Sequence, residues 1–174
     1  MASRNVTSWL VEHGLKLVGC LWATVLLGVL AWLNRQNGGM TFLVPPFAAT
    51  LTIMVYLPNA PVARPVAVVC GSVFGAAIGT VLSLFLGVGA DVATLAAVTT
   101  MVLLPLARVF HPPGVALAMC PALLHLRLRF PIEVVLPFTL AAVLSWALIK
   151  RLLEVRATAC RDRASKLAAQ SWVN

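Results

Sequence analysis

Long apolar runs with almost no charges constrain this chain more than any other feature of its sequence. The segment Leu15 to Leu33 holds nineteen residues whose only charge is Lys16, and Val66 to Val88 holds none. As an α-helix, nineteen residues cover about 28 Å, which is close to the thickness of the hydrocarbon core of a bilayer. These runs predict helices that cross a membrane.

The composition supports this interpretation and excludes other classes of protein. Apolar residues make up 61% of the chain and charged residues 10%, whereas soluble domains carry about 25% charged residues. One small core cannot bury so much apolar surface, so the excess is expected to face lipid. Such hydrophobicity also excludes a disordered chain. The net charge of +8 does not indicate nucleic-acid binding, because six of the thirteen Lys and Arg residues lie from Lys150 onward.

The apolar segments predict an all-α, polytopic membrane helix bundle with four full spans and two short broken or re-entrant half-helices that start at Pro-Pro pairs. The predicted full spans are 15–33, 66–88, 92–110 and 131–149, and the short segments begin at Pro45-Pro46 and Pro112-Pro113. We expect one transmembrane domain over 1–153 and a basic cytoplasmic tail over 154–174. The tail could lie on anionic lipid as a short helix or extend into solvent.

The two halves of the domain, about 15–89 and 92–153, share one order of segments, which predicts an internal two-fold repeat. Each half has a long helix, a Pro-Pro start of a short segment, a polar break and a second long helix, and the Pro-Pro pairs stand 67 residues apart. Paired, Pro-interrupted short segments are typical of transporter sites near the bilayer midplane. A helix that starts inside the membrane leaves unpaired N–H groups, which can donate hydrogen bonds to an anion.

The residues at these breaks favour an anion over a cation as the ligand. The candidate substrate-binding residues, which are basic, hydroxyl-bearing or close to the helix starts, are Phe47, Ala48, Thr50, Arg64, Arg108, His111, Pro112, Pro113 and Gly114. Arg64 and Arg108 could instead reach lipid headgroups. His111 could donate to an anion or carry a proton with it, and the alternative is a hydrogen bond at the helix start.

Three glycines at four-residue spacing, Gly71, Gly75 and Gly79, form one stripe on the predicted helix 66–88. A stripe of small residues lets another backbone approach closely, so we assign it to helix packing, either within one protomer or between protomers. A symmetric homodimer would shield the broken helices from lipid.

The basic tail predicts that the C-terminus is cytoplasmic, and the N-terminus with Arg4 and Lys16 is expected on the same side. Both termini on one side require an even number of crossings. Four spans with two re-entrant segments satisfy this, and so do six crossings. We expect an integral protein of a bacterial inner (cytoplasmic) membrane.

The stretch His111-Pro112-Pro113-Gly114, which follows Leu106-Ala107-Arg108, resembles the HPP family of small integral membrane proteins. Pro46-Phe47-Ala48-Ala49-Thr50, and Pro58-Asn59-Ala60-Pro61 with Pro65, resemble first-half stretches of the same family. The resemblance covers about 15–153 and implies a protein usually described with four transmembrane helices, some relatives being associated with nitrite transport. The chain departs from the family pattern at Ala48, Arg64 and Val115.

The leading hypothesis is therefore a membrane transporter or channel for a small inorganic anion, with nitrite first, bound between the half-helix N-termini. The alternative is a non-transporting interaction or regulatory module that packs through the glycine stripe. We expect no enzyme, because no nucleophile with a paired base and no HExxH motif is present. We therefore expect no catalytic residue and no cofactor. We also expect no metal site, because Cys20, Cys70 and Cys120 show no CxxC spacing and have no nearby His or Cys partner in the sequence. The expected partners are the lipid bilayer and a small anion, with no nucleic acid.

Overall fold

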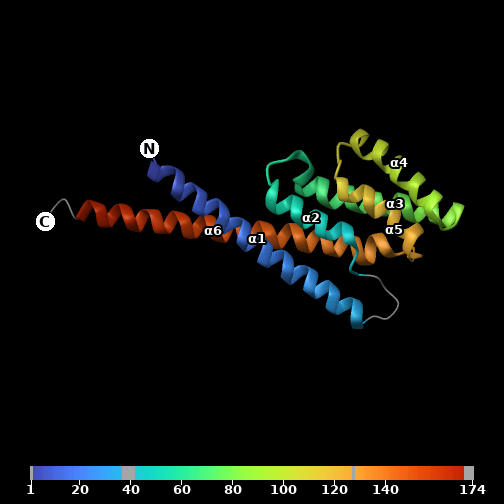
Figure 1. Ribbon diagram of the computed structural model, residues 1–174, viewed down its shortest axis with the longest axis horizontal. Helices are drawn as coiled ribbons and strands as arrows, with labels where there is room; N and C mark the ends of the chain where they lie inside the picture. Colours follow the sequence, from blue (N-terminus) through green and yellow to red (C-terminus); the bar gives the residue numbers. More distant parts are fainter. Residues whose placement is uncertain (1, 37–41, 127, 171–174) are drawn as a thin grey trace. The chain divides into compact units, whose positions relative to one another are not determined.

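The computed structural model describes the backbone of residues 2–36, 42–126 and 128–170, and the side chains of 14–36, 42–126, 128–156 and 158. The described residues form helices and the turns between them, without a strand. The elements, shown in Figure 1, are α1 (Ala2–Gln36), α2 (Pro45–Tyr56), the 3₁₀ turn η1 (Pro61–Ala63), α3 (Pro65–Leu86), α4 (Ala90–Leu106), α5 (Pro112–Leu124), the π turn η2 (Pro131–Val135) and α6 (Leu136–Gln170). The predicted all-α class is confirmed.

Three helical stretches are long and apolar enough to cross a membrane: Gly14–Gln36, Pro65–Leu86 and Pro131–Arg156. The short segments predicted after the Pro-Pro pairs form α2, with 12 residues, and α5, with 13 residues. At 1.5 Å per residue each covers about 18 to 20 Å, less than the hydrocarbon core.

The predicted span 92–110 forms a shorter helix than expected, because α4 has 17 residues and ends at Leu106. Arg108 has a left-handed backbone with φ of 57°. Its N–H donates to the carbonyl of Pro105 at 2.9 Å, and the N–H of Val109 donates to that of Leu104 at 3.1 Å. These two bonds satisfy the last carbonyls of α4 and turn the chain toward the second Pro-Pro pair.

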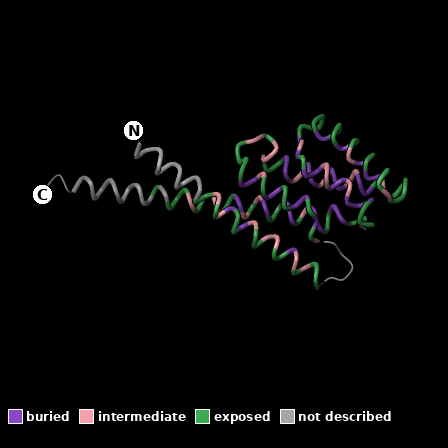
Figure 2. Tube along the Cα trace, in the orientation of Figure 1, coloured by how far each residue is buried: buried purple, intermediate pink, exposed green. Residues whose placement is uncertain are grey.

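The chain divides into two compact units, residues 1–143 and 144–174, and the contacts described below lie in the first. In that unit α3, α4 and α5 pack on one another, α1 packs on α2, and α2 also contacts α5. Figure 2 shows buried positions along α3 and α5. The side chains of Arg161, Arg163 and Lys166 in the predicted basic tail, and residues 171–174, lie outside the described part.

The glycine stripe of α3 faces α5 of the same chain, so the close packing that it permits is made within the protomer. A Cβ added at Gly75 would overlap the backbone of Gly114, whose carbonyl carbon would be 2.7 Å away, and one added at Gly79 would overlap Ala118. In return, a Cβ at Gly114 would overlap the backbone of Gly71. The two helices therefore meet backbone to backbone, as small residues allow in membranes.

We expect Gly75→Ala to destabilise the protein by about 1 to 3 kcal/mol, because the new methyl group meets backbone atoms that cannot rotate away. The matched control is Gly28→Ala in α1, where nothing lies within 4 Å of the added Cβ. The control should be neutral or stabilising by up to about 1 kcal/mol. Thermal denaturation in detergent, followed by circular dichroism, measures both, and equal stability of the two variants would contradict the close crossing.

Candidate functional site

His111 is the residue around which the candidate site is built. It is the N-cap of α5 and has an extended backbone with φ of −135° and ψ of 110°, as expected for a residue before proline. Its side chain is fully buried at 0% exposure. The Cβ of His111 would lie 2.8 Å from a Cβ added at Gly71, so the glycine of α3 leaves the room that the histidine occupies.

Both ring nitrogens of His111 have partners in the first half of the chain. Nδ1 lies 2.8 Å from the carbonyl oxygen of Val62, in the turn η1. Because a carbonyl only accepts, Nδ1 carries the hydrogen and donates it. Nε2 lies 3.1 Å from the hydroxyl of Thr50 on α2, and in the neutral ring it accepts the hydrogen of that hydroxyl.

The hydroxyl of Thr50 has two acceptors within reach but only one hydrogen. Besides Nε2 of His111, the carbonyl oxygen of Pro46 lies 3.2 Å away. Thr50 is itself fully buried. The side chain therefore connects the start of α2 to the residue that precedes α5.

The two predicted arginines are exposed and do not share the buried position of His111. Arg64 is the N-cap of α3, two residues after Val62, and Arg108 is the left-handed residue after α4. The bond from His111 to Val62 joins the two backbone segments that carry these arginines. The positive charges thus lie on the segments beside the buried ring, with both side chains open to the surroundings.

The starts of α2 and α5 have the same local structure. Val44 and His111 are extended N-caps, each followed by two prolines. The first residue after each pair has an N–H that donates to the carbonyl of the N-cap. The distance is 3.1 Å from Phe47 to Val44 and 2.8 Å from Gly114 to His111. Proline has no N–H, and the amides from Ala48 and Val115 onward belong to the regular hydrogen-bond pattern inside each helix. The amides outside that pattern are therefore those of the N-caps, Val44 and His111.

The remaining predicted residues are divided between the core and the surface. Phe47, Pro113 and Gly114 are buried, whereas Ala48 and Pro112 are exposed. The ring of Phe47 stacks on that of Phe138, at the start of α6, with centroids 3.9 Å apart and an interplanar angle of 24°.

Sequence reasoning missed two partners in this region, the carbonyl of Val62 and the ring of Phe138. A backbone carbonyl has no signal in the sequence. The position of Phe138 did have a signal, the spacing of 67 residues between the Pro-Pro pairs. The same spacing separates Gly71 from Phe138 and Phe47 from Gly114. The contact of Gly71 with Gly114 and the contact of Phe138 with Phe47 thus join positions that are related by the same spacing of 67 residues.

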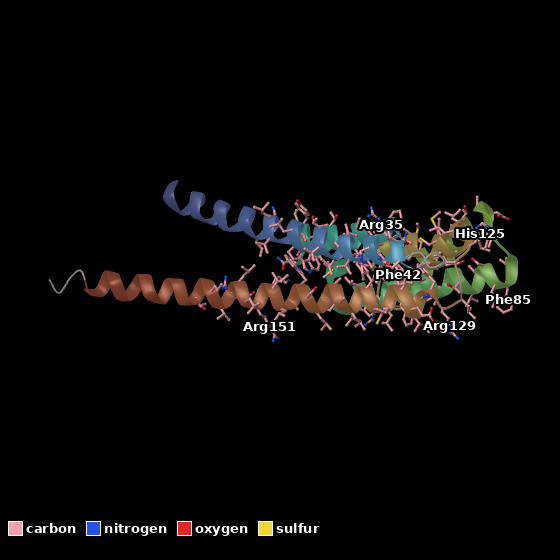
Figure 3. All side chains as sticks on the ribbon, turned by 90° about the horizontal axis from the view of Figure 1, so that it is seen from below. Arg35, Phe42, Phe85, His125, Arg129 and Arg151 are labelled. Carbon is pink, nitrogen blue, oxygen red and sulfur yellow. The ribbon has the colours of Figure 1, made fainter. Side chains whose placement is uncertain are left out.

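Among the described residues, no group of three or more His, Cys, Asp or Glu side chains is placed to hold a metal ion. The described cysteines, Cys20, Cys70 and Cys120, are not joined in disulfides. Glu133 pairs with Arg129 one helical turn before it, at 3.3 Å, and both side chains are exposed. Arg129 is labelled in Figure 3.

Over the residues that the structure describes, these features define an all-helical integral membrane protein in which a buried histidine links two short helices that start at Pro-Pro pairs. The chain matches the family described as "HPP, transmembrane region" over residues 8–158, and it belongs to this family. The family resemblance noted in the sequence is thereby confirmed. No curated protein and no solved structure matches the chain.

We expect a favourable coupling of about 0.5 to 1.5 kcal/mol between Phe47 and Phe138, because stacked rings contribute beyond the area that they bury. A double-mutant cycle with Phe47→Leu, Phe138→Leu and the double variant measures it by thermal denaturation in detergent. A coupling free energy of zero would contradict the stack.

Proposed function

We propose that this protein is a membrane transporter or channel for a small inorganic anion, most simply nitrite, bound between the N-termini of α2 and α5. The observation that carries the proposal is His111, a buried side chain that joins the two half-helix starts through Thr50 and Val62. Two short helices that start within the apolar region at prolines, with basic residues on the adjoining segments, supply the positive end that an anion needs.

The proposed architecture is an internal two-fold repeat with four crossings and two re-entrant half-helices. Reciprocal packing supports the repeat: α5 of the second half packs on α3 of the first, and α2 of the first half meets the start of α6 through Phe47 and Phe138. Because α2 and α5 are too short to cross, re-entrant segments fit better than six full crossings. In this arrangement α4, at about 26 Å, is the fourth span.

We further propose that the protein lies in a bacterial inner membrane with both termini cytoplasmic, and that it has no catalytic step or cofactor. A homodimer would cover the exposed side of α2, where Ala48, Thr52 and Tyr56 share one face. The alternative, an interaction module that packs through Gly71, Gly75 and Gly79, would need another surface, since α5 of the same chain already covers these glycines.

Purified protein in liposomes should take up nitrite with saturation, and His111→Ala should raise the KM roughly tenfold or more, because a buried hydrogen-bonding group next to the anion is lost. His125→Ala is the matched control, because His125 is exposed at the other end of α5 (Figure 3). Absence of flux for nitrite and for a panel of other anions, with folded wild-type protein, would favour the interaction module.

The role of the Arg108 charge can be tested separately from the left-handed backbone conformation of this residue. Arg108→Gly removes the charge while keeping, and easing, the left-handed conformation. We expect the variant to be as stable as wild type or more so, yet to show a higher KM for nitrite, with Arg108→Lys close to wild type. An unchanged KM in Arg108→Gly would assign the arginine to lipid headgroups.

A further inference from the structure

We infer that His111 and Thr50 form a proton-binding site, and that the transported anion crosses together with one proton bound there. The inference rests on the proposed anion transport and adds the coupling ion to it. It is carried by the geometry of the two hydrogen bonds of the ring and by the second acceptor of the Thr50 hydroxyl.

Only one ring nitrogen is open to a proton. Nδ1 is already protonated, since it donates to the carbonyl of Val62 at 2.8 Å. Nε2 therefore carries the lone pair of the neutral ring, and its partner is a hydroxyl, which can both donate and accept. If a carbonyl faced Nε2 in place of the Thr50 hydroxyl, Nε2 would have to donate and the ring would be charged. If an N–H faced it, Nε2 would have to accept and the ring would be neutral.

Protonation of Nε2 can occur without moving any heavy atom. The new Nε2–H donates to Oγ1 of Thr50 at the existing 3.1 Å, and the hydroxyl hydrogen turns to the carbonyl of Pro46 at 3.2 Å. Every polar group of His111 and Thr50 keeps a partner in both states. This matters in a buried site, because an unpaired polar group there is strongly unfavourable.

The charged ring lacks a counterion of its own among the described residues. On the elements around it, α2 carries Tyr56, bonded to Cys20, and α3 carries Cys70. α5 itself carries Cys120, and α4 carries Asp91 at its exposed start. Arg64 follows η1, Arg108 lies three residues before the ring, and Glu133 of η2 pairs with Arg129. None of these side chains makes a hydrogen bond or ion pair with the ring.

A buried cation without a counterion is unfavourable, so an anion at the adjacent half-helix starts would stabilise it. Proton and anion then each raise the affinity for the other by the same factor. One proton and one nitrite ion cross together, and the step moves no net charge.

A purely structural role for the pair is disfavoured by the residues at the equivalent positions of the proposed repeat. Val44 and Leu117 stand 67 residues from His111 and Thr50, respectively, and both are fully buried. The same helix start is thus built with an apolar pair at the equivalent place. Building a Pro-Pro half-helix does not require the histidine and the threonine.

Uptake into liposomes under imposed gradients tests the inference on the wild-type protein. With an acidic exterior, we expect nitrite uptake into liposomes that contain the protein to be several-fold faster than uptake into empty liposomes under the same pH gradient. A potassium diffusion potential of either sign should leave the rate unchanged. Uptake driven by an inside-positive potential and indifferent to the pH gradient would overturn the inference while leaving anion transport intact, whereas no uptake at all would overturn the proposed function as well.

The protonation state of the ring can be read directly by nitrogen NMR of ¹⁵N-histidine-labelled protein in lipid, with His111→Gln to assign the signal. At neutral pH we expect the tautomer protonated at Nδ1. Saturating nitrite should raise the midpoint of the titration by roughly 0.7 to 2 pH units, the range of typical coupling between two sites. A midpoint that does not respond to nitrite would overturn the inference.

Two variants of Thr50 separate the proton relay from packing. Thr50→Val keeps the shape but removes the hydroxyl, and it should abolish the response of uptake to the pH gradient. Thr50→Ser keeps the hydroxyl and should retain the response even if packing is loosened. Loss of the response in both, with wild-type thermal stability, would contradict the relay.

Discussion

The backbone contact between α3 and α5 is the interaction on which the rest of this structure depends. Gly71, Gly75 and Gly79 let α5 approach so closely that its own backbone replaces the side chains missing from α3. Van der Waals packing of this kind is the main source of helix association in lipid, where no hydrophobic force acts between apolar surfaces. The same approach places His111 against Gly71, within reach of Thr50 and Val62. A wider crossing would leave the ring without its partners.

Much of the fold could be predicted from the sequence, because the signals are local. Proline pairs fix where α2 and α5 begin, and apolar runs with few charges indicate α1, α3 and the last helix. The end of α4 could not be predicted, since it depends on Arg108 taking a left-handed conformation that glycine usually takes. The partner of the glycine stripe was left open, as a stripe indicates close packing without saying against which helix.

The candidate site was predicted by residue type and not by geometry. His111 and Thr50 were both selected, but their direct hydrogen bond joins residues 61 positions apart and has no signal in a single sequence. The arginines were selected for charge, and the structure places both at exposed positions on adjoining segments. What organises the site, a backbone carbonyl from η1, belongs to no side chain. Membership of the HPP transmembrane family establishes that the chain is a membrane protein of this family.

The glycine crossing of α3 with α5 and the aromatic contact of α2 with the start of α6 are built by opposite means, glycine against glycine in one and phenylalanine against phenylalanine in the other. The glycine crossing therefore does not tolerate larger residues, whereas the aromatic contact tolerates smaller ones. Any substitution at the glycine crossing adds volume to a contact that has no space, so the contact is either kept with its glycines or lost. At the aromatic contact, either phenylalanine can be replaced by leucine or methionine. Each replacement loses packing but creates no clash. Variation during evolution should then accumulate at Phe47 and Phe138, and the glycine crossing, which positions His111, should change least.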